Sequence, residues 1–217
     1  MKVYSSDGKY IIDVNESNKF DYGTYGNVFR YNEELSYKVF KHENIHKPDP
    51  IILLKNYKLE NFNKIIDLLY NSKLEYSGYI MKHYEPDNFD ILSNKEYLLN
   101  SVNNIYDGIM VYTKNLFEIY DLHIGNVIVN SEGITVIDVD DYKKTHSDNT
   151  YINVFRFKQM LISLLSMYIK KYNVKDPMEA HLLIRRLFED KTNDINHFNN
   201  TMKRYSKPID YFTKVLK

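Results

Sequence analysis

The feature that most constrains this chain is a short apolar hairpin flanked by acidic and amide side chains. Residues 127–129 have the pattern of a buried strand, and residues 134–137 that of the returning strand. Between them, residues 130–133 read Asn-Ser-Glu-Gly, which is typical of a turn. Because the open ends of a hairpin lie on the same side, the residues that flank it are expected to come together.

Three flanking side chains are suited to handling a metal ion or a proton. Asp121 and Asn126 precede the first strand, and Asp138 follows the second. Two carboxylates and an amide oxygen suit Mg²⁺, a hard ion that prefers oxygen ligands and often shares its shell with substrate phosphates. The pattern predicts a phosphate-transfer site, and the competing interpretation is a surface hairpin with solvated acids.

A glycine-containing segment near the N-terminus points to the same chemistry. Residues 20–29 read Phe-Asp-Tyr-Gly-Thr-Tyr-Gly-Asn-Val-Phe, with Gly23 and Gly26 in a predicted hairpin. A backbone without Cβ approaches phosphates closely and exposes its N–H groups. Such a pair alone is a weak signal, because any hairpin can carry one.

The strand that follows has a lysine inside it. Residues 35–41 read Leu-Ser-Tyr-Lys-Val-Phe-Lys. Strand alternation places Lys38 on the same face as Phe40, as expected for a lysine that extends into a half-apolar cleft, and Lys41 on the opposite face. The competing interpretation is an exposed lysine on an edge strand.

In their order and spacing, these motifs resemble those of the protein-kinase-like superfamily: a glycine-rich loop, a strand lysine, Asp-x-x-x-x-Asn and Ile-Asp-x-Asp. The resemblance covers roughly residues 20–165, with Asp21 at the first glycine position. It implies an α+β, two-lobed fold in a single domain over residues 1–217. The β-rich N-lobe would span residues 1–84 and the mainly helical C-lobe residues 85–217.

The resemblance also implies a role for each site residue, with ATP and Mg²⁺ as the cofactors. Lys38 would pair with the α- and β-phosphates, and Asp121 would be the catalytic base. Asn126 and Asp138 would hold Mg²⁺. The expected ATP-binding residues are Gly23, Gly26, Val28, Lys38, Met81 (at the gatekeeper position) and Tyr84, with the backbone of residues 82–84 hydrogen-bonding the adenine.

Several positions depart from the family pattern. Tyr120 stands where many regulated protein kinases have arginine, and His123 stands where they usually have lysine. Asn153 would replace the aspartate that braces the catalytic loop. Asp140 replaces a glycine and is expected to be either a second metal carboxylate or a solvated acid. The acidic partner of the strand lysine is not obvious: Glu60 is the better candidate by helical context, and Asp49 lies too near two prolines.

Three functional classes follow from the resemblance. The leading one is an ATP-dependent serine/threonine protein kinase. The second is a small-molecule phosphotransferase of the aminoglycoside or metabolite type, favoured by Asp-Leu-His and by the short segment after Asp138. The third is a nucleotide-binding pseudokinase that acts as a binding module. The expected partners are ATP and a hydroxyl acceptor, which is a protein or a small molecule.

Bulk properties exclude other classes. The chain has 29 basic and 29 acidic residues, which argues against nucleic-acid binding through a broad basic face. It has no cysteine, so disulfides and cysteine zinc sites are excluded. No 18-residue apolar run exists and the N-terminus lacks the core of a signal peptide, so a cytoplasmic protein without membrane contact is expected.

Periodicity predicts the remaining elements. Strands are expected over residues 9–14, 20–31 (as a hairpin), 35–41 and 79–82. Residues 51–70 are expected to be mainly helical. Three further helices are indicated by the stripes Leu98, Val102, Ile105, Tyr106, Ile109 and Leu116, then Phe157, Met160, Leu161, Leu164, Leu165 and Tyr168, and then by residues 178–188.

Overall fold

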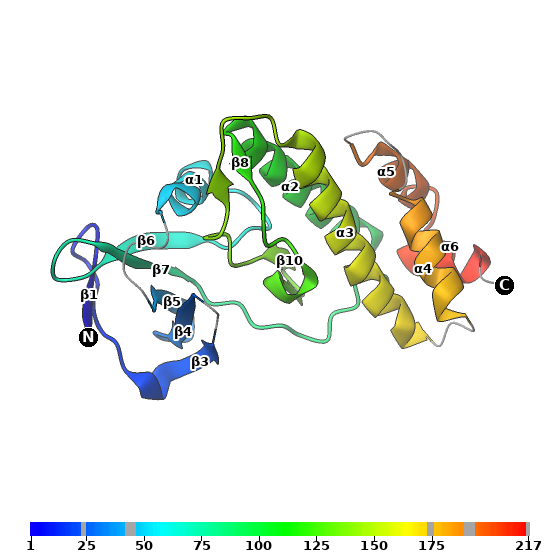
Figure 1. The fold of residues 1–217 in the computed structure, drawn as a ribbon. Helices are drawn as coiled ribbons and strands as arrows, with labels where there is room; N and C mark the ends of the chain where they lie inside the picture. Colours follow the sequence, from blue (N-terminus) through cyan, green and yellow to red (C-terminus); the bar gives the residue numbers. More distant parts are fainter. Residues whose placement is uncertain (23–24, 42–46, 173–175, 189–193, 216–217) are drawn as a thin grey trace.

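The computed structural model describes residues 1–22, 25–41, 47–172, 176–188 and 194–215. A seven-stranded antiparallel sheet lies at one end of the molecule, and most of the helices lie at the other (Figure 1). The strand order in the sheet is β2-β1-β6-β7-β5-β4-β3. These strands are β1 (Lys2–Ser5), β2 (Ile11–Asp13), β3 (Lys19–Tyr22), β4 (Gly26–Arg30), β5 (Leu35–Phe40), β6 (Ile65–Tyr70) and β7 (Tyr76–Lys82).

Strand β5 runs through the sheet between β4 and β7, with Lys38 opposite Val28 on one side and Tyr79 on the other. Gly78 on β7 makes this pairing possible. Its φ is +156°, and a Cβ there would lie 1.9 Å from the carbonyl oxygen of Lys38. A side chain at this position is therefore incompatible with the observed pairing of β5 with β7.

The two faces of β5 are buried against different neighbours. Tyr37 and Val39 belong to a small apolar cluster on one face of the sheet. The opposite face carries Ser36, Lys38 and Phe40, and Phe40 packs against the main core of the protein. The predicted alternation is thereby confirmed, and Lys38 points toward the side of the sheet where the other motif residues lie.

The helices are α1 (Asp49–Tyr57), α2 (Lys95–Lys114), α3 (Thr150–Ile169), α4 (Pro177–Arg186), α5 (Asn196–Met202) and α6 (Pro208–Val215). Helix α1 lies over the sheet, whereas α2 and α3 pack side by side and α4 to α6 gather at the far end (Figure 1). Short 3₁₀ turns are η1 (Glu16–Asn18), η2 (Ile124–Asn126) and η3 (Lys170–Tyr172).

Short strands between α2 and α3 form two further ribbons. The predicted hairpin is confirmed as β9 (Val127–Asn130) paired with β10 (Gly133–Val136). The second ribbon pairs β8 (Phe117–Glu118) with β11 (Lys143–Lys144). Asp121 and Asn126 therefore lie between β8 and β9, and residues 137–142 lie between β10 and β11.

The predicted helical stripes form the main core. Leu98, Val102, Ile105 and Ile109 of α2 are all fully buried. On α3 the buried residues include Phe157, Met160, Leu161, Leu164, Leu165 and Tyr168. Leu116 was wrongly included in the first stripe: it lies beyond the end of α2, is 40% exposed and has a φ of 62°. Among the described residues, no helix is long and apolar enough to cross a membrane.

One prediction of secondary structure was wrong, and one strand was missed. Residues 51–70 are not mainly helical, because α1 ends at Tyr57, Lys58 after it is left-handed, and residues 65–70 form β6. Both faces of this strand are covered, because Leu68 lies in the main core and Leu69 in the small apolar cluster, so its apolar run shows no alternation. Strand β1 was not predicted at all. The α+β class is confirmed, and the division into two lobes stays a prediction.

Candidate functional site

Lys38 meets the two aspartates of the loop after β10. Its amine donates to Oδ1 of Asp140 at 3.0 Å and also to Oδ1 of Asp138. Only 4% of Lys38 is exposed, as is 4% of Asp140. The predicted approach of residue 38 to residue 138 is therefore present, and the competing interpretation of Lys38 as an exposed edge-strand lysine is wrong.

The close approach of two carboxylates and one amine changes how these groups hold protons. Burial disfavours the charged amine of Lys38, but the negative charges of Asp140 and Asp138 outweigh burial and raise its pKa. For Asp138, burial and the adjacent Asp140 carboxyl raise the pKa to about 7, against the opposing effect of Lys38. The site thus has one more acid than it can neutralise with its own cation.

Asp138 also has an unusual backbone conformation. Its φ is 60°, in the left-handed region that few residues other than glycine adopt. Such a conformation typically costs on the order of 1–3 kcal/mol and persists only where the surroundings enforce it. Here it aims a half-buried carboxyl at Lys38 directly after the buried strand β10.

Asp121, His123 and Asn126 form a hydrogen-bonded loop. Asn126 donates from Nδ2 to the backbone oxygen of Asp121 at 2.9 Å and to its Oδ2 at 3.1 Å. His123 Nε2 lies 3.1 Å from Oδ1 of Asp121, and its Nδ1 accepts from the backbone N–H of Gly125 at 3.0 Å. Because Nδ1 accepts, the neutral ring carries its proton on Nε2 and donates to Asp121. Both carboxylate oxygens of Asp121 are oriented in this way.

This loop is braced from beneath by a buried amide, as the sequence predicted for Asn153. Asn153 has no exposed surface, and its Oδ1 accepts from the N–H of Ile119 at 2.8 Å. Its Nδ2 donates to the carbonyl of Phe117 at 2.8 Å and to Oγ1 of Thr113 at 2.9 Å. These three hydrogen bonds connect the start of the loop to residues of α2, β8 and α3.

Tyr120, which replaces the expected arginine, is covered by cations. Lys143 Nζ lies 4.6 Å from the centre of its ring, and the guanidinium of Arg156 lies 4.8 Å from it. Arg156 also pairs with Glu118 at 3.1 Å and donates to the carbonyl of Ile119. Position 120 therefore anchors the loop through cation–π contacts, which require an aromatic ring rather than a charge.

The Lys38–Asp138 contact lies in a narrow cleft, which Asn126, Val28, Met81 and Tyr84 also line. The cleft encloses about 100 Å³, below the about 300–1,000 Å³ of common ligand pockets. A nucleotide would thus require the cleft to widen. Of the two predicted loop glycines, Gly23 lies outside the described residues.

Gly26 is required for a close approach to the lysine. A Cβ at this position would lie 2.9 Å from Cε of Lys38 and 3.0 Å from the carbonyl oxygen of Val39. Both distances are shorter than a methyl group tolerates without displacement of its neighbours. The absence of a side chain at residue 26 therefore allows β4 to lie against the stem of Lys38.

The predicted adenine-binding backbone is partly occupied by other hydrogen bonds. The N–H of Lys82 donates to the carbonyl of Lys64 at 2.9 Å, and the N–H of His83 donates to that of Glu34 at 2.7 Å. The ring of His83 bonds Oγ of Ser36 at 2.6 Å and lines the cleft. Two of the three N–H groups of residues 82–84 are thus committed to the protein itself.

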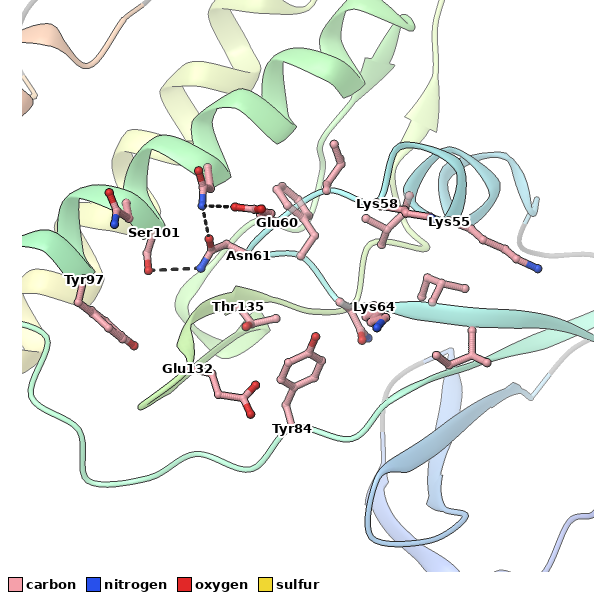
Figure 2. A pocket seen from close by; sticks show the side chains of 18 residues that line it. Lys55, Lys58, Glu60, Asn61, Lys64, Tyr84, Tyr97, Ser101, Glu132 and Thr135 are labelled. Atoms are coloured by element: carbon pink, nitrogen blue, oxygen red, sulfur yellow. Dashed lines mark hydrogen bonds between the residues drawn. The ribbon is translucent and has the colours of Figure 1, made fainter.

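The prediction that Glu60 pairs with Lys38 was wrong. Glu60 accepts from Nδ2 of Asn104 on α2 at 2.9 Å and lines a separate cavity of about 930 Å³ (Figure 2). Asn61, with a φ of 60°, donates from Nδ2 to the carbonyl of Ile134 at 2.8 Å. The chain after α1 is bound to the hairpin and to α2, so this acid faces away from the β5 lysine.

Asp140 is 4% exposed, so the prediction of a solvated acid was wrong, whereas its role as a second metal carboxylate stays a prediction. Neither alternative included its contact with Lys38. Its Oδ1 also accepts from the hydroxyl of Tyr79 at 2.9 Å. The sequence carries no local signal for this role, because Ile137 and Val139 alternate with the two aspartates. Such alternation places the acids on the face opposite the apolar residues, where exposure is expected.

The donors that face the cleft fit Mg²⁺. The described residues contain no cluster of three or more histidine and carboxylate groups able to hold a metal on their own. Asp138 and Asn126 line one cleft and offer a carboxylate and an amide oxygen, since Nδ2 of Asn126 is bound to Asp121. Mg²⁺ is commonly held by one or two carboxylates together with substrate phosphates, so a site completed by a nucleotide suits this pair.

Comparisons with known proteins give a limited result. No protein-family model matches the chain, and no curated protein matches it. Among solved structures, it is similar to the kinase PK-1 of the Cydia pomonella granulovirus, with 17% sequence identity and a TM-score of 0.45. The similarity covers 60% of this chain and 54% of that chain, so this protein spans about half the length of the viral kinase structure.

Proposed function

We propose that this chain is an ATP-dependent phosphotransferase whose acceptor is a serine or threonine hydroxyl of a protein. The observation that carries the proposal is the contact of Lys38 with Asp138 beside the Asp121–Asn126 loop. A buried amine, a metal-binding pair and an oriented carboxylate are the groups that phosphoryl transfer requires, since the protein contributes mostly position and electrostatics.

Each residue has a role in this reaction. Lys38 would offset negative charge on the α- and β-phosphates, and Asn126 and Asp138 would hold Mg²⁺, which neutralises charge on the transferring group. The acceptor oxygen forms a bond to the γ-phosphorus as the bond to the ADP oxygen breaks, and the hydroxyl proton passes to Asp121. The carboxylate of Asp121 is 46% exposed, so it is accessible to an acceptor from outside.

The donors on Asp121 support a positioning role. His123 and Asn126 each donate to one of its oxygens and thereby fix the orientation of the carboxylate. In phosphoryl transfer, the protein contributes mostly position and electrostatics. Orientation of the acceptor hydroxyl is therefore the main contribution that we assign to this residue.

A small-molecule acceptor is the second candidate, and the segment after Asp138 favours it. Only residues 139–149 separate that aspartate from α3. Part of this segment is tied to the body of the protein, because β11 pairs with β8 and Tyr142 is buried. Little chain remains to form a platform for a peptide, whereas a small acceptor needs none.

The experiment is a transfer assay with γ-labelled ATP and Mg²⁺, using a generic protein substrate and a panel of hydroxylated metabolites and antibiotics. We expect Asp121→Ala to lower kcat by about 10²–10⁴-fold, the usual contribution of general acid–base catalysis. Asp107→Ala, at an exposed position of α2, is the matched control and should leave turnover unchanged. Label on protein identifies a protein kinase, and label only on a metabolite identifies the second candidate. Nucleotide binding without transfer to any acceptor would indicate the third class, a pseudokinase.

A further inference from the structure

Lys38 is held from one direction only. Both of its carboxylate partners, Asp138 and Asp140, come from the loop after β10. The sole acid of helix α1 (Asp49–Tyr57) is its first residue, and the acid that follows the helix, Glu60, is bound to Asn104. Within the described residues, no acid of the helix that lies over the sheet pairs with the lysine.

The two aspartates differ in how firmly they are fixed. The side chain of Asp138 is 36% exposed and faces the cleft, whereas that of Asp140 is 1% exposed. Asp140 has a second support, because the hydroxyl of Tyr79 donates to the same oxygen that binds Lys38. Tyr79 is itself 1% exposed and lies directly opposite Lys38 in the sheet. The lysine, the tyrosine and Asp140 form a closed, buried triangle.

An ammonium group has three donors, so Lys38 can bind Asp140 and phosphate oxygens at the same time. Asp138 is then available for a metal ion. If Asp138 turns to a metal ion, Lys38 keeps one carboxylate, and its remaining donors are available to phosphate oxygens. We propose that Asp140, oriented by the Tyr79 hydroxyl, is the positioning residue that holds Lys38 toward the nucleotide phosphates. This inference rests on the proposed function. It assigns to Asp140 the role of lysine partner that the family resemblance suggested for Glu60.

The test measures ADP binding by calorimetry in the presence of EDTA, so that no metal ion contributes. Four proteins form a double-mutant cycle: wild type, Lys38→Met, Asp140→Asn and the double variant. We expect Lys38→Met to weaken ADP binding by about 10- to 100-fold, as for loss of a charged hydrogen-bond donor. Asp140→Asn alone should weaken it by about 3- to 10-fold. In the Lys38→Met background the same change should have less than about a twofold effect, because Asp140 acts through the lysine.

Asp67 provides a matched control for the loss of a buried acid. It is 2% exposed, accepts from Lys55 Nζ at 2.6 Å and also accepts from the hydroxyl of Ser6, yet it does not line the cleft. Asp67→Asn should lower the denaturation midpoint and leave ADP affinity unchanged. Tyr79→Phe keeps Asp140 intact and removes only its supporting hydroxyl. It should weaken ADP binding about two- to threefold, again only when Lys38 is present, and it serves as the test should Asp140→Asn fail to fold.

A titration with Mg²⁺ separates positioning from metal binding. We expect the Mg²⁺ concentration that half-maximally tightens ADP binding to rise in Asp138→Asn and to stay unchanged in Asp140→Asn. Losses that multiply in the double variant, or an increased Mg²⁺ requirement in Asp140→Asn, would show that Asp140 acts independently of Lys38 and overturn the inference. Unchanged ADP affinity in Asp140→Asn would also overturn it. If the wild type binds no ADP, with or without Mg²⁺, the proposed function fails and the inference fails with it.

Discussion

Replacing Asn153 with alanine should destabilise the protein strongly, although residue 153 touches no substrate. The change removes the acceptor of the Ile119 N–H and the donor to the Phe117 carbonyl. Ile119 is fully buried and Phe117 is 3% exposed, so water cannot replace these partners. Each unsatisfied buried group costs about 1–3 kcal/mol, which gives a total loss of about 2–6 kcal/mol in the free energy of unfolding. Thr113 keeps its own bond to the carbonyl of Ile109 and adds nothing to this sum.

The assay is urea denaturation followed by circular dichroism. With a slope of about 3 kcal/mol per molar urea for a chain of this size, the midpoint should fall by roughly 0.7–2 M. Asn200→Ala, at an exposed position of α5, is the control and should shift the free energy of unfolding by less than about 0.5 kcal/mol. A shift for Asn153→Ala as small as that of the control would refute the reasoning.

Replacing Asn153 with aspartate should make the loss of stability depend on pH. The aspartate can still accept from Ile119, but it can donate to the Phe117 carbonyl only when protonated. Burial beside a carbonyl oxygen should raise its pKa above the unfolded value of about 3.9. The folded state then binds more protons than the unfolded state, so stability falls as pH rises through this range. The deficit relative to wild type should grow from pH 5 to pH 8, and a pH-independent deficit would contradict this account.

Three further predictions concern the cleft. Gly26→Ala should lower the free energy of unfolding by about 1–3 kcal/mol through overpacking. It should also weaken ADP binding, because the new methyl group displaces Lys38. Unchanged ADP affinity in calorimetry would contradict this displacement. Asp138 has a folded pKa of about 7 and an unfolded value of about 3.9, so the folded state binds more protons between them and stability should fall as pH rises from about 4 to about 7. Denaturation midpoints across this range should lose that slope in Asp138→Asn. Glu60→Gln should leave ADP affinity and turnover unchanged, since its carboxylate binds Asn104, and a tenfold loss of either would restore it as a partner of the lysine.

The parts of the site that were predictable follow from strict local periodicities. The two-residue period of β5 fixed which face Lys38 occupies, and the hairpin of β9 and β10 required Asp138 to lie on the side of Asn126. Strand β6 was not predictable in this way, because a strand covered on both faces has the composition of a buried helix. Asn153 was recognisable only through the resemblance, since a single amide in a helical stripe has no periodic signal of its own.

The partner of Lys38 was misassigned because the sequence gives no information on which element supplies a charge across space. Helix α1 contributes a base toward the sheet: Lys55 binds the buried Asp67 of β6 at 2.6 Å. Burial opposes ionisation of Asp67, but the hydrogen bonds from Lys55 and Ser6 prevail and hold its pKa at about 2. The helix is thus anchored by a cation of its own, and the β5 lysine is bound by acids of the loop after β10. Because the Lys55–Asp67 pair shares no residue with the contacts of Lys38, a displacement of α1 removes neither carboxylate partner of the β5 lysine.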